Sequence, residues 1–415
     1  MKSYRTELDL NDRQVTACLQ HAGAARWAYN WGLKRKNEAR QLKQKYPTAI
    51  DFHKELNALK QVSKDAGGVP WMYEVSKCSA QQALRNLDAA FDRFFAYCKA
   101  KKAGKKHLRR VGYPKFKSRN RGVGSFTLTG AIHVTERTIQ LPRLGVLRLK
   151  EHNYFPTGTM ITAATVSERA GRWFVAIRTD ETQFAGTTGT ETLGVDVGIK
   201  HLAVLSDGTV FENPRALKQA TSRLRMLQKS VSRKVKGSSN RRKAKVRLAH
   251  QHYRVSCVRN DAISKATSAI ATRARILGIE SLNVAGMMKN HCLARSLADA
   301  SLAEFHRQLE YKVKWAGGII VKADRWFASS KTCSKCGVVK DTLLLSERVF
   351  RCEACGLEID RDLNAAINLR NMAASSGATA CGDSSSGLKV APRAVQTKLP
   401  SMKQEPNTNQ LGGCP

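Results

Sequence analysis

Four cysteines near the end of the chain constrain its fold more than any other feature. They form two pairs, Cys333 with Cys336 and Cys352 with Cys355, and 15 residues lie between the pairs. Two knuckles of this spacing place four thiolates at the corners of one tetrahedron, the geometry of a structural Zn²⁺ site. Gly337 and Gly356 follow the knuckles, where the backbone must turn tightly. The pattern predicts a zinc module over residues 331–358, and its closed sulfur shell predicts a structural role.

The other cysteines indicate the compartment. The chain has 11 cysteines, and those outside the two pairs have no regular spacing. This usage is typical of a reducing cytoplasm and not of a secreted disulfide framework. No stretch approaches the ~18 consecutive apolar residues that span a bilayer, and the first residues do not resemble a signal peptide. We therefore expect a cytoplasmic protein with no membrane partner.

The charge of the chain predicts its partner. It has 71 Lys and Arg residues against 33 Asp and Glu residues, so its formal charge is +38. Apolar residues make up 42% of the chain, enough to bury a core, which excludes a disordered basic tail. Each Lys or Arg that docks on a phosphate releases a condensed counterion. A nucleic acid is therefore expected as partner, with an anionic membrane surface as the weaker alternative.

The first half of the chain changes its hydrophobic period once. Residues 11–43 and 76–99 have apolar residues at helical spacing, whereas residues 124–182 alternate as short strands separated by glycines. This order predicts a small β-barrel or sheet into which helices are inserted. The first helix contains three aromatic residues, Trp27, Tyr29 and Trp31. Core packing is the favoured interpretation of these rings, and stacking on nucleobases is the alternative.

Two basic segments predict where a nucleic acid would bind. Residues 101–122 hold ten Lys or Arg residues and no acid, and the turn expected at Gly-Tyr-Pro-Lys-Phe would present Lys115 and Lys117. Residues 215–275 hold 18 Lys or Arg residues and one acid, with helical periodicity and a break at residues 236–239. This second segment predicts a two-helix arm. Its expected contacts are Arg233, Lys234, Arg241, Arg242 and Lys243.

Three carboxylates lie where structure alone does not require them. Asp196 interrupts the apolar strand LGVDVG, Glu280 ends the apolar strand ILGIE, and Asp362 begins an expected helix. A charge in a buried strand is costly unless it is paired or bound to a metal. Carboxylate oxygens select Mg²⁺ or Mn²⁺ over zinc, and two such ions can catalyse phosphodiester hydrolysis. A plain helix cap remains the alternative for Asp362.

Several motifs together resemble the TnpB family, the OrfB-type proteins of small insertion sequences that are related to type V CRISPR effectors. They are GVDVGIKHLAVLSDG, GIESLNV, SSKTCSKCG and CGLEIDRDLNAAINL, with RWAYN and GYPKFKSR in the first half. The resemblance implies an RNA-guided DNA endonuclease with a split RuvC-like, RNase H-type domain. It also implies that Asp196, Glu280 and Asp362 form the acidic triad and that Asp360 is structural. From their position in the last helix, Asn364 and Asn368 are expected to cap that helix or to brace it against the first strand.

The expected fold class is therefore α/β plus β-barrel and helical parts. The domains are expected at residues 1–10 (first strand of a wedge β-barrel), 11–122 (helical recognition domain with the basic turn), 123–182 (remaining barrel strands), 183–192 (linker), 193–330 (first part of the RuvC-like nuclease, with the basic arm), 331–358 (zinc ribbon), 359–373 (last nuclease helix) and 374–415 (disordered tail).

The resemblance also implies the partners. A guide RNA and a double-stranded DNA target are expected, for a monomer that associates with the prokaryotic nucleoid when it is bound to DNA. Two other functions remain open. One is a transposase that joins element ends with the same carboxylates, although no independent helix-turn-helix is visible. The other is an RNA-guided regulator that binds without cleaving, although this requires a broken triad and all three acids are present.

Overall fold

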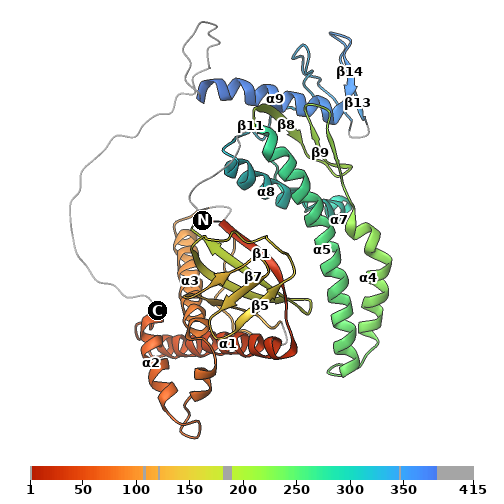
Figure 1. Ribbon diagram of the computed structural model, residues 1–415. Coiled ribbons are helices and arrows are strands. Elements are labelled where there is room, and N and C mark those ends of the chain that lie inside the picture. Colours follow the sequence, from red (N-terminus) through yellow and green to blue (C-terminus); the bar gives the residue numbers. More distant parts are fainter. Residues whose placement is uncertain (1, 106–108, 120–121, 181–188, 345–346, 381–415) are drawn as a thin grey trace, which may run out of the picture.

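The computed structural model describes residues 2–105, 109–119, 122–180, 189–344 and 347–380. Figure 1 shows two lobes along the chain, one containing α1 and β1 and the other containing α5 and α9. Each lobe has its own apolar core, because the buried residues of the first cluster end at Ile177 and those of the second begin at Leu193. The apolar packing therefore divides between Ile177 and Leu193, whereas the predicted domain boundaries stay a prediction.

The first lobe is an antiparallel sheet with helices inserted after its first strand. The strands are β1 (Lys2–Asp9), β2 (Ser125–Leu128), β3 (His133–Val134), β4 (Thr138–Leu141), β5 (Gly145–Leu149), β6 (Ile161–Arg169) and β7 (Arg172–Thr179), in the sheet order β2-β6-β7-β1-β5-β4-β3. The inserted helices are α1 (Asp12–Gln41), α2 (Ala49–Gln61), the 3₁₀ helix η1 (Pro70–Glu74) and α3 (Lys77–Lys102). This insertion was predicted, whereas closure of the sheet into a barrel stays a prediction.

Local signals explain where these helices begin and what they bury. Asn11 caps α1 in a reciprocal capping box with Gln14, which satisfies two backbone N–H groups at the helix start. The apolar stripe of α3 packs inward through Leu84, Leu87 and Phe91. Because these residues recur at intervals of three and four, they lie on one face of the helix. The hydrophobic period therefore predicted both the helix and its buried side.

The second lobe contains a mixed sheet. Its strands are β8 (Glu191–Asp196), β9 (His201–Leu205), β10 (Val210–Glu212), β11 (Ala274–Ile279) and β12 (Ile319–Lys322), in the order β10-β9-β8-β11-β12. Strands β8, β11 and β12 run parallel. The linker predicted over residues 183–192 extends too far at its C-terminal end, because Glu191 and Thr192 already belong to β8 and pair with β11. Residues 181–188 lie outside the described part.

Helices flank this sheet and extend from it. They are α4 (Ala216–Ser232), α5 (Ser239–Arg273), α6 (Val284–Met287), α7 (His291–Ala300), α8 (Leu302–Trp315) and α9 (Arg361–Ala380), and β13 (Val349–Arg351) pairs with β14 (Glu358–Asp360) in a small module beside them. Figure 1 shows α4 and α5 as a long hairpin, as the basic pattern predicted. Helix α9 continues to Ala380, beyond the predicted end at residue 373. The rest of the predicted tail, residues 381–415, is not described.

Two glycines allow α9 to lie against the sheet. Gly194 of β8 and Gly278 of β11 are directly paired across the parallel strands. A Cβ atom on Gly194 would lie 1.9 Å from the carbonyl oxygen of Ala366, and one on Gly278 would lie 2.2 Å from that of Leu369. Both clashes are with the backbone of α9, which cannot rotate away as a side chain can. The missing side chains therefore set how closely α9 approaches β8 and β11.

We expect Gly194→Ala to destabilise the protein by about 3 kcal/mol or more, because overpacking against backbone forces the helix outward. Thermal and denaturant unfolding of the purified protein would measure the loss. Gly23→Ala is the matched control, since the nearest atom to its added Cβ is 3.9 Å away and alanine favours a helix over glycine. Equal stability of Gly194→Ala and the wild type would contradict this account of the helix contact.

Candidate functional site

Strand register brings two of the predicted carboxylates together. Val195 of β8 pairs with Ile279 of β11, and Asp196 and Glu280 each follow that pair by one residue. The two acids therefore stand at the carboxyl ends of neighbouring parallel strands. Ligand sites of open α/β sheets form at this edge, because the loops that leave the strands open a crevice there. Both side chains are partly buried.

The helix start that carries Asp362 is capped by a different acid. Oδ1 of Asp360 accepts hydrogen bonds from the backbone N–H groups of Asp362 at 2.9 Å and Leu363 at 3.1 Å. Asp360 therefore satisfies the exposed donors of the first turn of α9. The alternative that Asp362 is only the helix cap is wrong, and its carboxylate is available for another role. The structural role expected for Asp360 agrees with this geometry.

The carboxylates influence each other electrostatically. Burial raises the pKa of the Asp196 carboxyl well above its ordinary value, and the negative charges of Glu280 and Asp362 raise it further. The positive charge of Arg361 opposes the rise. Like charges that are partly buried without a partner are costly, so this arrangement favours a bound cation. Within the described residues, however, only the four cysteines have ligand atoms already gathered closely enough for a metal ion.

A loop held by α9 contacts Glu280. The hydroxyl of Ser329 donates a hydrogen bond to Oε1 of Glu280, and the carbonyl of Ser329 accepts one from Asn368 at 2.8 Å. Asn364 and Asn368 both donate to the carbonyl of Thr332, each at 2.7 Å. The two asparagines therefore brace α9 against the loop before the zinc module, and the predicted bracing against the first strand is wrong. Ser329 was missed because nothing in SSKTC marks one serine as a carboxylate partner.

The four predicted cysteines form one cluster. Their sulfur atoms all lie within 4.8 Å of one another. The two knuckles are built alike, since the N–H groups of Gly337 and Gly356 donate to the carbonyls of Cys333 and Cys352 at 2.9 and 3.0 Å. Both glycines have positive φ angles, +78° and +69°, a conformation that favours glycine. Four sulfur donors in two tight turns fit a tetrahedral metal ion.

The first cysteine is prepared for metal binding by its own knuckle. Burial acts to raise the pKa of the Cys333 thiol, but hydrogen bonds from the backbone of Cys336 and Lys335 and from the thiols of Cys336 and Cys355 together lower the pKa to about 6. A thiolate is the form that binds a metal ion. Phe350 is fully buried beside Cys333 and Cys352, so this module has one aromatic side chain as its apolar core.

The predicted cations of the basic arm gather at its far end. Arg233 and Lys234 follow α4, and Arg241, Arg242 and Lys243 lie in the first turns of α5. The guanidinium of Arg241 donates to the carbonyl of Lys234 at 2.7 Å, so this residue closes the turn between the helices. Arg233, Arg242 and Lys243 are exposed and form the tip of the arm.

The base of the arm is fixed by an acid that sequence reasoning missed. Asp299 of α7 is buried, accepts hydrogen bonds from the N–H groups of Leu217 and Lys218 at 2.9 and 3.0 Å, and pairs with Arg259 of α5 at 3.2 Å. It therefore caps α4 and links both arm helices to the lobe. An isolated Asp in an expected helix carries no sequence signal for such a long-range cap.

The first basic segment is docked on α1. Asn30 accepts from the N–H of Lys117 at 2.8 Å and donates to its carbonyl at 2.9 Å, and the hydroxyl of Tyr113 donates to Asn37 at 2.7 Å. Residues 111–118 have no turn or helix assignment, so the expected turn is instead a strap along the helix. The ammonium of Lys117 lies 4.0 Å from the ring centre of Tyr29, while Lys115 is exposed.

Comparison with known proteins identifies the family. A protein of Streptomyces pristinaespiralis, whose curated name describes an RNA-guided DNA endonuclease, is 35% identical over 97% of this chain and 95% of its own. The RNA-guided DNA endonuclease InsQ of Escherichia coli K12, also a curated name, is 30% identical over 98% of this chain and 97% of its own. The chain belongs to the TnpB family. The resemblance in the sequence motifs is thereby confirmed.

Three family models divide this TnpB-family chain. A model described as "Probable transposase" of the OrfB type matches residues 174–291, and a "Cas12f1-like, TNB domain" model matches residues 303–369, which include the cysteine cluster. A model described as a helix-turn-helix domain matches residues 1–45. In the structure, residues 2–45 form strand β1 and the single helix α1, whereas a helix-turn-helix needs two helices.

Solved structures are more distant from this TnpB-family protein. A CRISPR-Cas12f ternary complex is 18% identical, with a TM-score of 0.36, over 86% of this chain and 82% of that chain. The family assignment therefore depends on the sequence relatives. Among the residues that the structure describes, every helix is too short or too polar to cross a bilayer.

Proposed function

We propose that this protein is an RNA-guided, metal-dependent DNA endonuclease of a transposable element. The supporting observation is the parallel register that sets Asp196 beside Glu280, with Asp362 presented by the helix packed on the same two strands. The curated relatives that span nearly its whole length are described as RNA-guided DNA endonucleases. The carboxylates are therefore the catalytic candidates for phosphodiester hydrolysis.

The carboxylates would hold Mg²⁺ or Mn²⁺, since hard oxygen ligands select these ions. When bound, the ions would supply an activated water and stabilisation of the leaving oxygen. Asp196 and Glu280 hold their positions through the sheet, Asp362 through α9, and Ser329 orients Glu280 through its hydrogen bond. The four cysteines would hold Zn²⁺, whose role in this proposal is to fix the loop that carries Ser329.

The proposed domains follow the lobes. Residues 193–330 and 359–380 would form the RuvC-like, RNase H-type nuclease with the zinc ribbon embedded at 331–358. Residues 2–180 would form a wedge β-barrel with an inserted recognition domain that reads a short motif beside the target. The arm would hold the guide RNA and its DNA heteroduplex through the backbone, while base pairing reads the sequence. We propose a monomer in the prokaryotic cytoplasm.

One experiment tests this function. The protein is purified from its host with the RNA that it retains, the RNA is sequenced, and the complex is incubated with matched double-stranded DNA with and without Mg²⁺. We expect cutting that depends on both guide and Mg²⁺. A defined RNA with DNA binding but no cutting would favour a regulator. Joining of element ends without any bound RNA would favour a transposase, as the older family description implies.

The arm tip gives a separate prediction. Replacing Arg233, Arg242 and Lys243 together by alanine should weaken RNA binding. It should also make the negative slope of log affinity against log salt shallower by about 2 to 3, because each cation on a phosphate contributes roughly 0.7 to 0.9 to its magnitude. Titration of labelled RNA at several salt concentrations measures both quantities. The control exchanges Arg for Lys and Lys for Arg at these positions, which keeps the charge. An unchanged slope in the alanine variant would exclude the tip from the interface.

A further inference from the structure

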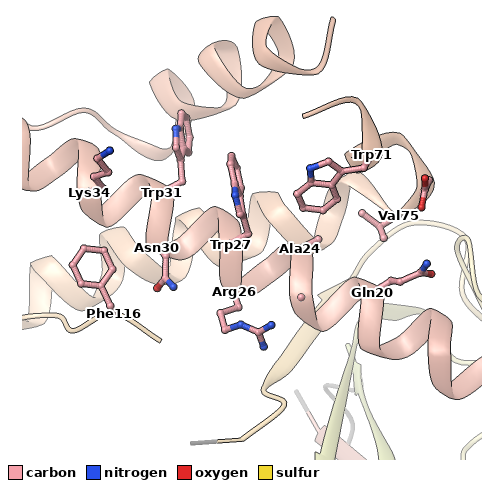
Figure 2. Close-up of a pocket in the computed structure, with 12 residues that line it drawn as sticks. Gln20, Ala24, Arg26, Trp27, Asn30, Trp31, Lys34, Trp71, Val75 and Phe116 are labelled. Carbon is pink, nitrogen blue, oxygen red and sulfur yellow. The ribbon is translucent and has the colours of Figure 1, made fainter. Parts of the chain in front are cut away.

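The first lobe contains an aromatic pocket that the proposed nuclease chemistry does not use. It has a volume of about 690 Å³ and lies between α1, η1 and the strap at Phe116. Figure 2 shows the rings of Trp27 and Trp31 projecting from α1, with Trp71 of η1 beside them. All three tryptophans are only partly buried. Core packing therefore accounts for part of each ring and leaves the rest facing the pocket.

The geometry of the rings makes a corner. Trp27 and Trp31 are nearly parallel, with an interplanar angle of 8° and centroids 5.8 Å apart, whereas Trp27 and Trp71 are perpendicular with centroids 5.9 Å apart. The centroids of Trp27 and Trp31 are already at the separation of two rings in direct contact, about 4.5–7 Å. No third ring can therefore enter between them. A planar guest would instead stack on one indole and meet the edge of the other.

Two small residues of α1 leave space in the pocket beside the tryptophan rings. Gly23 and Ala24 line the pocket one helical turn before Trp27. A Cβ atom added to Gly23 would meet nothing closer than Arg26, at 3.9 Å. Glycine costs helix stability without a compensating contact here. The space beside Trp27 therefore depends on the absence of a side chain at this position.

Polar groups around the pocket suit a nucleotide. Arg26 and Lys34 line it, and Glu74 is the single acid among the described lining residues. Within the described part of the chain, the indole N–H groups of Trp27 and Trp71 and the amide of Gln20 make no hydrogen bond in the structure, so they can meet the edge of a base. The +38 charge of the chain draws the polyanion that would deliver that base.

We propose that this pocket binds an unpaired nucleobase, stacked on the tryptophan corner, with its phosphate directed toward Lys34 at the edge of the pocket. The inference rests on the proposed function, since the guide RNA and the displaced DNA strand are the two sources of such a base. Aromatic stacking does not distinguish bases strongly, because every base has a π face. The pocket therefore serves as a sequence-tolerant anchor for a single strand.

The test compares base-bearing and abasic strands on the full-length protein. Competition binding uses dT10, U10 and an abasic decamer with the same number of phosphates. The wild type should prefer the base-bearing strands, and Gly23→Leu, which fills the pocket, should reduce that preference by roughly 5- to 150-fold. Gly23→Ala is the control and should keep the preference, because its single methyl group leaves the pocket open. Both substitutions favour the helix, so a difference between them reports on the pocket and not on helix stability. Equal preference in the Leu and Ala variants overturns the proposal.

A second pair of variants tests the stacking itself. Trp71→Ala should lose the preference for base-bearing strands, and Trp71→Phe should recover most of it, since a phenyl ring still offers a π face. A larger loss for U10 than for dT10 assigns the pocket to RNA, and the reverse assigns it to DNA. If the wild-type complex cuts DNA but Gly23→Leu leaves the preference for base-bearing strands unchanged, only this inference is overturned. Base preference without any cutting overturns only the nuclease.

Discussion

Asp196→Asn should reduce Mg²⁺-dependent cutting of guide-matched DNA by about a thousandfold or more, equivalent to about 4 kcal/mol of activation free energy. Asparagine keeps the size of the side chain but removes the charge that would hold the ion. Binding of RNA and DNA should remain nearly intact, because the affected group lies at the end of a strand and not on the arm. The complex is assayed for cleavage rate and, by mobility shift, for DNA binding.

The stability of this variant separates catalysis from folding. Burial raises the pKa of the Asp196 carboxyl, and Glu280 and Asp362 raise it further, so the charged form is unfavourable in the metal-free protein. Removing that charge should leave the melting temperature without Mg²⁺ unchanged or higher. A fall in melting temperature together with the loss of cutting would indicate misfolding instead.

Two acids beside the start of α9, Asp360 at the end of β14 and Asp362 in the first turn of α9, provide the matched control. Asp362→Asn should lose cutting as Asp196→Asn does, whereas Asp360→Asn should cut at nearly the wild-type rate. Asparagine caps a helix about as well as aspartate, so the hydrogen bonds to the N–H groups of Asp362 and Leu363 would persist. If Asp360→Asn is inactive and Asp362→Asn is active, the assignment of the two acids is reversed.

Cys352→Ser should remove the bound zinc and destabilise the module by about 3 kcal/mol or more, since the binding free energy of a structural metal is folding free energy. Cutting should fall at least tenfold as well. The loop between Ser329 and Thr332 is held by Asn364 and Asn368, and its Ser329 hydroxyl contacts Glu280. Disorder in the zinc module would therefore disturb the position of the Glu280 carboxylate. Metal analysis, thermal unfolding and the cleavage assay measure the three effects.

Cys292→Ser is the control for this change. Cys292 is exposed on α7 and lies outside the cluster, so its zinc content, stability and cutting should match the wild type. Adding Mg²⁺ in excess should not restore cutting to Cys352→Ser, because oxygen-selecting ions do not replace zinc at sulfur ligands. A Cys352→Ser protein with full activity and a normal melting temperature would show that the cluster has no structural role.

Chemistry that needs particular residue types was predictable from the sequence. Thiolates at knuckle spacing, carboxylates in apolar strands and a long run of cations are local patterns, and the physical cost of burying charge makes them conspicuous. The cysteine cluster, the arm and the candidate acids were therefore found before the fold was known. The local pattern already singled out Asp362, and the resemblance to the TnpB family added that Asp360 is structural.

Contacts between distant segments were not predictable in the same way. Ser329 beside Glu280, Asp299 at the start of α4 and the strap along α1 each join elements that are far apart in the chain. A single Ser, Asp or Asn occurs too often for its partner to be inferred from sequence. The expected turn at residues 112–116 was wrong for this reason, because docking on Asn30 replaced the local turn preference.

The groups that could perform chemistry were recognisable in the linear chain, because metal and phosphate ligands are limited to a few side chains at characteristic spacings. Where those groups meet depends on the folded arrangement. Gly194 and Gly278 pair across two strands, and that register brings Asp196 level with Glu280 and admits α9 with Asp362. Register and helix approach are set by backbone pairing and by the space beside each residue, which arise only when the chain has folded.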